Sequence, residues 1–217
     1  LSTLSGGVLF VVDDGDSAMD AEQAVYRVGS MHNKLAVLRD AGSEFAQPVL
    51  DDLGADYVDG IEARSRLAWM PLDEDTRFNE VVLNHHGVDG VVRMVQQATL
   101  RNFEGKLFGP MLQGAVRLFG RDPGRYLTWM PRGWSNIYRN AGRVVVDNDS
   151  ERREVTVEFH DLPKGFFAPG YPEGFIGAFG AFFAITDTDG DFEMTRRDVD
   201  AGLLQYVGRW SPKAASA

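Results

Sequence analysis

The stretch that decides the fold is RVVVDNDSERREVTVEFH, residues 143–160, where the hydrophobic period changes to two. In its second half Val155, Val157 and Phe159 occupy alternate positions, so they share one face of an extended segment. A β-hairpin with a polar turn at Asp147–Ser150 is therefore predicted. The two predicted strands are Arg143–Val146 and Glu151–Phe159.

A second hairpin is expected near the C-terminus, with strands at Met194–Val199 and Leu203–Trp210 around a turn at residues 200–202. Between the hairpins, Gly174–Ile185 reads as an apolar helix. The order β-β-α-β-β predicts a four-stranded antiparallel sheet. Its core face should carry six residues: Val155, Val157, Phe159, Leu204, Tyr206 and Trp210.

Before Asn140 the apolar residues recur at helical spacing, so we expect an α+β protein with a helical N-terminal part packed on this sheet. The segment from Trp69 to Leu72 should be an extended connector, because a residue before proline avoids helical geometry. The expected helices are one or two in 17–42, then 43–53, 73–86, 88–103, 107–119 and a short one from Asp122-Pro123 toward Trp129. The expected organisation is an N-terminal arm or edge strand (1–16), a helical subdomain (17–140), an antiparallel α+β unit (141–210) and a flexible tail (211–217).

Composition excludes several classes of function. The 217 residues carry 32 acidic against 22 basic side chains, a net charge of −10, which argues against a nucleic-acid partner. The absence of cysteine removes disulfides, thiolate nucleophiles and cysteine-ligated clusters, and suits the cytoplasm, where we expect the chain. No apolar run is long enough for a membrane span.

Residues 187–198 place oxygen-bearing side chains at the spacing of a calcium loop. Phe192 stands where such a loop needs glycine, so a polar turn between helix and strand is the favoured reading and a calcium-responsive module the alternative. The calcium ligands would be Asp187, Asp189, Asp191, Glu193 and Asp198.

Catalytic motifs are lacking in the sequence. There is no nucleophile elbow, phosphate loop or dinucleotide fingerprint, and no two histidines have the i, i+4 spacing of a helical zinc site. Paired acids such as Asp13-Asp14, Asp51-Asp52 and Asp73 with Asp75 fall at turns and helix starts. We therefore expect no cofactor and no enzymatic activity, with a carboxylate-based enzyme of unknown class as an open alternative.

Glycines and aromatic residues suggest where a ligand could bind. Gly174, Gly177 and Gly180 recur every third residue, with Phe175 and Phe179 projecting elsewhere, so the segment is either a tightly packed helix or the glycine floor and phenylalanine wall of an apolar pocket. Plain packing is favoured. The candidate ligand-binding residues are Trp129, Trp134, Tyr138, Phe159, Phe175, Phe179, Gly177 and Gly180.

The supply of aromatic residues also favours an interface. A helix that is apolar on most sides lies inside a protein or against a partner. We therefore expect a homodimer or a protein partner. The candidate interface residues are Phe166, Phe167, Phe182 and Phe183.

A wider resemblance rests on the order of several segments. They are Trp69-Met-Pro-Leu72, the glycine-punctuated helices through Gly120, Leu127-Thr-Trp-Met-Pro131, Val155–Pro163, the helix Gly174–Ile185 and Tyr206-Val-Gly-Arg-Trp210. Together they resemble an uncharacterised Myxococcales-type domain family, similar to the 4-vinyl reductase domain and the heme-NO-binding-like fold. The resemblance implies a helical subdomain packed on an antiparallel α+β unit that serves as a sensor, binding module or dimerising subunit. The family's heme-ligand histidine and Tyr-x-Ser-x-Arg motif have no counterpart here, so neither heme nor zinc is carried over.

The sequence therefore predicts a non-enzymatic ligand-binding or scaffold module that is part of a dimer or larger complex.

Overall fold

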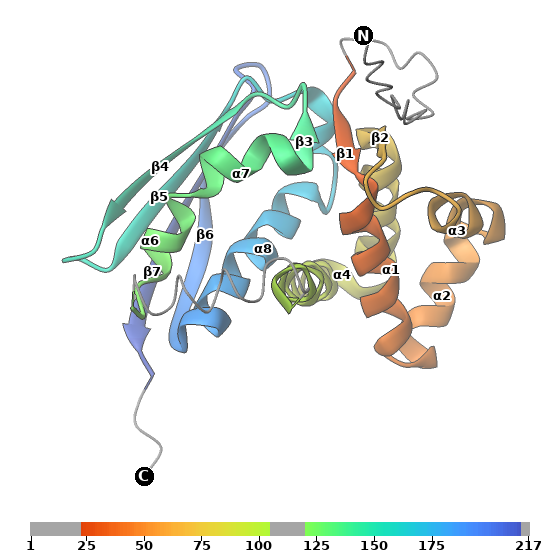
Figure 1. The fold of residues 1–217 in the computed structure, drawn as a ribbon, viewed down its shortest axis with the longest axis horizontal. Coiled ribbons are helices and arrows are strands. Elements are labelled where there is room, and N and C mark those ends of the chain that lie inside the picture. The colour runs from red at the N-terminus through yellow and green to blue at the C-terminus, as the bar shows by residue number, and fades with distance from the viewer. Residues whose placement is uncertain (1–22, 105–119, 214–217) are drawn as a thin grey trace, which may run out of the picture.

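The computed structural model describes residues 23–104 and 120–213. Its largest sheet has four antiparallel strands in the order β4-β5-β7-β6 (Figure 1). The strands are β4 (Arg143–Asp149), β5 (Glu154–His160), β6 (Thr188–Asp198) and β7 (Leu203–Pro212). The apolar helix α8 (Tyr171–Thr186) connects the two hairpins and lies against the sheet, so the predicted α+β class and β-β-α-β-β order are confirmed.

On the other side of α8 the helical part follows in layers (Figure 1). The long helix α4 (Leu72–Glu104) packs on α8 and bends at Gly87, whose φ of 65° places it outside helical geometry. Beyond α4 lie α1 (Val28–Asp40), α2 (Ser43–Leu53) and α3 (Ala55–Glu62). Two short helices, α6 (Pro123–Leu127) and α7 (Met130–Ile137), and the 3-10 turn η1 (Lys164–Phe167) complete the elements near the sheet.

Most predicted helix boundaries are confirmed. Gly54 ends α2, and Asp122 caps α6 by accepting a hydrogen bond from the Arg125 backbone N–H. The two helices expected on either side of Gly87 are the two halves of α4. The predicted helix 107–119 and the arm 1–16 lie outside the described residues.

A second sheet was not predicted. It consists of β1 (Val25–Arg27), β2 (Trp69–Pro71) and β3 (Tyr138–Arg139), in the antiparallel order β2-β1-β3. The strands have two or three residues, too few to show a period of two in the sequence. This small sheet joins the start of α1, the start of α4 and the end of α7, and it lies between the large sheet and the helices α1–α3 (Figure 1).

The six residues predicted for the core face of the large sheet are all buried: Val155, Val157, Phe159, Leu204, Tyr206 and Trp210. Pairing places Val157 opposite Tyr206 and Phe159 opposite Leu204. They belong to one continuous core that also includes residues of α1, α2 and α4. The outer face of the sheet carries polar side chains such as Thr156 and Glu158, as expected for an antiparallel sheet with one solvated face.

Two local predictions were wrong. The turn expected at Asp147–Ser150 falls three residues later, because β4 continues to Asp149, whose side chain accepts hydrogen bonds from the backbone of Glu151 and Arg152. The segment 187–198 is neither a polar turn nor a calcium loop: Asp187 ends α8, and residues 188–198 are the edge strand β6, paired with β7. The predicted strand Met194–Val199 is the second half of β6, which begins six residues earlier than predicted.

Asp189, Asp191 and Glu193 are two residues apart along β6, so they share one face but are separated by about 6.6 Å at the strand rise of about 3.3 Å per residue. Asp187, Asp189, Asp191, Glu193 and Asp198 therefore do not converge on one ion. Phe192, which stands at the glycine position of the loop pattern, is buried against Phe179 and Phe183. Within the described part of the chain, no group of three or more acidic or histidine side chains is placed to hold a metal ion.

Candidate functional site

An aromatic cluster fills the space between α7, α8, η1 and the inner face of the four-stranded sheet. It consists of Trp134, Phe159, Phe166, Phe175, Phe179 and Tyr206. The rings of Phe159 and Phe175 stack with centroids 4.6 Å apart, and Trp134 lies 5.1 Å from Phe159. Phe179 and Tyr206 meet edge to face at 5.3 Å. These are the contact geometries of a packed aromatic core.

The polar ends of the cluster are satisfied within the chain. The indole N–H of Trp134 donates to the Ala141 carbonyl at 3.1 Å, and the Tyr206 hydroxyl donates to the Pro172 carbonyl at 2.9 Å. Burial raises the pKa of Tyr206 above its ordinary value. The cluster therefore presents no free polar group to a ligand at these two positions.

A buried polar network lies beside the aromatic cluster. The Lys34 ammonium of α1 donates to Asp75 of α4 at 2.5 Å and to the Asn79 side-chain oxygen at 3.0 Å. Tyr171, the first residue of α8, donates from its hydroxyl to the second Asp75 oxygen at 2.8 Å, and the same hydroxyl is hydrogen-bonded to that of Tyr138 at 3.2 Å. All five side chains are buried, so the ion pair between Lys34 and Asp75 lies inside the protein and is surrounded by three neutral hydrogen-bond partners.

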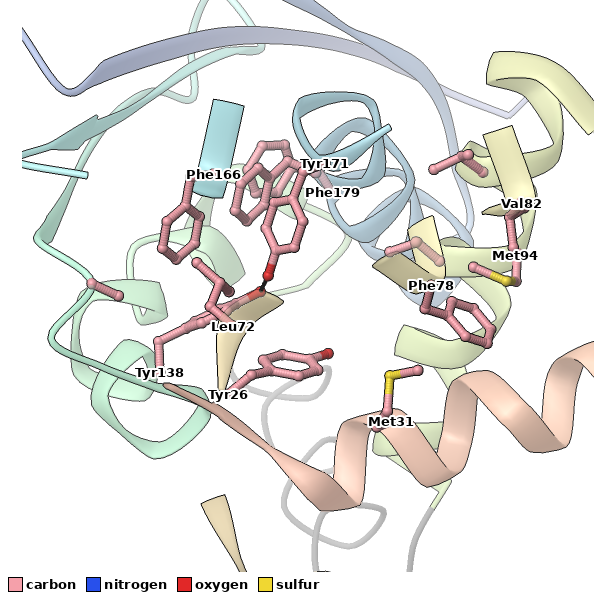
Figure 2. Close-up of a cluster of buried hydrophobic side chains, with 14 of the residues drawn as sticks. Tyr26, Met31, Leu72, Phe78, Val82, Met94, Tyr138, Phe166, Tyr171 and Phe179 are labelled. Carbon is pink, nitrogen blue, oxygen red and sulfur yellow. Dashed lines mark hydrogen bonds between the residues drawn. The ribbon is translucent and has the colours of Figure 1, made fainter. Parts of the chain in front are cut away.

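Three tyrosines surround this ion pair. Figure 2 shows the rings of Tyr26, Tyr138 and Tyr171 gathered at one place, with the hydroxyls of Tyr138 and Tyr171 directed toward each other. Burial raises the pKa of each of the three, and the negative charge of Asp75 raises it further. The tyrosines therefore remain protonated at neutral pH and serve as hydrogen-bond donors and apolar walls.

The network connects parts of the chain that are distant in sequence. Lys34, Asp75, Tyr138 and Tyr171 come from α1, α4, β3 and α8. A buried ion pair costs desolvation energy and contributes little net stability, but breaking it leaves an unpaired charge. It therefore fixes how the helical part sits on α8 and the small sheet.

The glycines of α8 face α4. A Cβ at Gly177 would lie 2.2 Å from the Val92 carbonyl oxygen, and one at Gly180 would lie 3.2 Å from the Gln96 side chain. The glycines therefore allow two helices to approach closely, while Phe175 and Phe179 point into the aromatic cluster. The arrangement supports the packing reading over a pocket with a glycine floor.

The other predicted site residues are divided between core and surface. Trp129 is 50% exposed, away from the buried Trp134 and Tyr138. Phe166, Phe167 and Phe183, predicted for an interface, are buried in the core of this chain, so as interface residues they were wrong. The physical reason is that η1 folds back onto α4 and α8, which bury its two phenylalanines. Phe182 is half-buried and meets Phe103 of α4 edge to face.

None of the four histidines lies in the interior. His32 and His86 make hydrogen bonds to the backbone oxygens of Ile61 and Phe45, at 2.9 and 2.8 Å. His85 lies 3.2 Å from Asp52, and His160 lies 3.0 Å from Glu158. Each imidazole therefore has a local structural role outside the aromatic cluster.

A surface cleft of about 750 Å³, which was not predicted from the sequence, lies where α2, α3 and the start of α4 meet. Its walls include Asp56, Tyr57 and Asp73, and Arg77 crosses it to donate to the Leu53 carbonyl at 2.9 Å. Only the turn at Gly54 marks this place in the sequence. The cleft lies among α2, α3 and α4, apart from the aromatic cluster.

The fold of this chain is that of H-NOX domains, the heme-NO-binding fold. An H-NOX protein from K. algicida superposes with a TM-score of 0.60 at 8% identity, covering 86% of this chain and 97% of that one. H-NOX from T. Tengcongensis gives 0.58 at 14% identity, with 87% and 100% covered. An oxygen-binding H-NOX domain related to soluble guanylate cyclases gives 0.58 at 14%, with 88% and 98% covered. No protein-family model and no curated protein matches the sequence.

The residues present do not fit the heme that this fold implies. An axial ligand to heme iron is most often histidine, cysteine, methionine or tyrosine. The chain has no cysteine, and its histidines lie outside the interior. The buried methionines 31, 70 and 94 are packed within the hydrophobic core, and the interior tyrosines 26, 138, 171 and 206 use their hydroxyls within the chain. The aromatic cluster also fills the space between α7, α8 and the sheet.

Proposed function

We propose that this chain is a heme-independent module of the H-NOX fold that acts by binding, without catalysis, as a scaffold in a dimer or larger complex. The observation that carries the proposal is the aromatic cluster. Its six side chains close the interior with ring contacts of 4.6 to 6.2 Å, and their polar ends bond to the chain itself.

Surface features support a role in interaction. Three large apolar side chains are exposed close to α7 and the small sheet: Leu67, Trp129 and Ile137, at 79%, 50% and 39%. Exposed tryptophan is typical of interaction surfaces. Trp129 therefore remains our candidate for contact with a partner or ligand, although its predicted neighbours Trp134 and Tyr138 are buried.

We also propose that the chain is related to the Myxococcales-type family and the 4-vinyl reductase domain, that it is bacterial, that it is located in the cytoplasm and that it forms a homodimer. No helix in the described ranges is long and apolar enough to cross a membrane.

Native mass spectrometry of the purified chain, expressed in cells supplied with a heme precursor, tests the proposal. We expect an integral multiple of the polypeptide mass, with no heme and no stoichiometric small molecule. Dissociation in acid followed by a second mass measurement is the control, since it releases any tightly held ligand.

A stoichiometric apolar ligand, released on dissociation, would overturn the closed interior and restore the pocket interpretation. A chain that stays monomeric at micromolar concentration would refute the dimer, though not the closed interior. The same spectrum therefore distinguishes the two parts of the proposal.

A further inference from the structure

Two arginines contact one tryptophan ring on the small sheet. Arg27 of β1 pairs directly with Trp69 of β2, and its guanidinium carbon lies 3.5 Å from the ring centroid. Arg139 of β3 pairs with Val25, on the other side of β1, and its guanidinium carbon lies 4.2 Å from the same centroid. Val25 and Arg27 are two residues apart along β1, so they lie on the same face of the sheet. Their partners Arg139 and Trp69 therefore lie on that face too. We call Arg27, Trp69 and Arg139 the arginine–tryptophan patch.

The two positive charges are close together and have no counter-charge among the residues that the structure describes. The two guanidinium carbons can be no farther apart than the sum of their distances to the Trp69 ring centroid. This sum is shorter than the Debye length of ~8 Å at physiological salt, so solvent ions screen the repulsion between the two charges only in part. Neither guanidinium forms an ion pair within residues 23–104 and 120–213. Desolvation lowers the pKa of Arg27, and the nearby charge of Arg139 lowers it further. In a chain of net charge −10, this is a local concentration of positive charge.

The donors of the patch are only partly used. Arg27 donates from Nε to the Asn136 carbonyl at 3.2 Å and from Nη1 to the Leu67 carbonyl, which holds its guanidinium in place. The Arg139 side chain is exposed, and its guanidinium makes no hydrogen bond to the described residues. One guanidinium is therefore held in place, and the five N–H groups of the other have no partner within 23–104 and 120–213.

We propose that the arginine–tryptophan patch binds an oxyanion, a carboxylate or phosphate group, between the guanidiniums of Arg27 and Arg139. Arginine suits this role because its planar fork makes two parallel hydrogen bonds to such a group. The indole holds both side chains extended, so less entropy is lost on binding. Leu67, whose side chain is exposed beside the patch, is placed to contact an apolar part of the ligand.

Calorimetric titration of the full chain with inorganic phosphate, and separately with acetate, at constant ionic strength tests this site. We expect Arg139→Gln to weaken binding about tenfold or more, and Arg139→Lys to weaken it less, since lysine keeps the charge but not the fork. Arg132→Gln is the matched control: Arg132 also lies over a tryptophan, Trp129, at 4.8 Å, and among the described residues no second arginine lies over that ring. Its affinity should be unchanged.

Arg139 is exposed, so its substitution leaves the fold intact, and circular dichroism confirms this before titration. Binding of phosphate but not acetate would identify a phosphate site, and the reverse a carboxylate site. Equal affinity in wild type and Arg139→Gln, or no saturable binding of either anion, would overturn the proposal. Neither result bears on the closed interior, which is tested separately.

Discussion

Trp134→Ala tests whether the interior is packed by the chain itself. The indole is 7% exposed, its ring lies 4.2 Å from that of Tyr138 and 5.1 Å from that of Phe159, and its N–H bonds to the Ala141 carbonyl. Removing a buried tryptophan costs about 3–5 kcal/mol, because the transfer energy is lost and a cavity remains. For a chain of this size we expect the melting temperature to fall by roughly 2–4 °C per kcal/mol, or ~6–20 °C in total.

Urea unfolding of the variant, followed by circular dichroism, measures this loss. Trp129→Ala is the matched control, since Trp129 is half exposed and its replacement should cost no more than about 1.5 kcal/mol. Indole should partly restore the stability of Trp134→Ala by filling the new cavity. A loss below about 1 kcal/mol at Trp134 would contradict the packed interior, because it would mean that the wild-type protein already contains open space there.

The remaining predictions concern helix contact, the buried ion pair and pH. Gly177→Ala should lower the free energy of unfolding by about 1–3 kcal/mol, because its Cβ would meet the Val92 carbonyl at 2.2 Å. Gly180→Ala is the control and should be nearly neutral. Equal unfolding curves for the two variants would contradict the close approach of α8 and α4. Lys34→Met should lower the free energy of unfolding by about 3–5 kcal/mol, because it leaves Asp75 buried without its ion-pair partner. The double variant with Asp75→Leu should recover part of this stability, and strictly additive losses in a double-mutant cycle would show that the two groups are not coupled. Burial raises the pKa of the tyrosines at 26, 138, 171 and 206 above that in the unfolded chain, about 10, so stability should be fully present below pH ~10 and fall as pH rises above it. In an absorbance titration at alkaline pH these tyrosines should ionise together with unfolding, and their ionisation in a still-folded chain would contradict the burial.

The large sheet was predictable because its residues obey simple periods. The alternation through Val157 and Tyr206, and the cap at Asp122, report local geometry that the structure confirms. The second half of β6 was predicted as a strand, but its first half was mistaken for a turn because its alternating acids match the spacing of a calcium site. The deciding fact was the partner of Phe192, which packs on Phe179 of α8, and such contacts between distant residues are not visible in the sequence.

The site was less predictable than the fold. The aromatic residues were recognised, but whether Phe166 faces a partner or the core depends on how η1 folds back, which periodicity does not determine. The ion pair joins Lys34 and Asp75 across 41 positions. The arginine–tryptophan patch likewise needs three short strands to meet, and strands of two or three residues leave no pattern.

Titration with hemin distinguishes a heme-independent module of the H-NOX fold, which we propose, from one that binds heme. The purified chain is titrated with hemin and the Soret absorbance is recorded, with the four variants in which one histidine each is replaced by alanine as controls. We predict no saturable one-to-one complex, and only weak binding that does not depend on any histidine. A stoichiometric complex whose Soret band is lost when a single histidine is replaced would contradict the account.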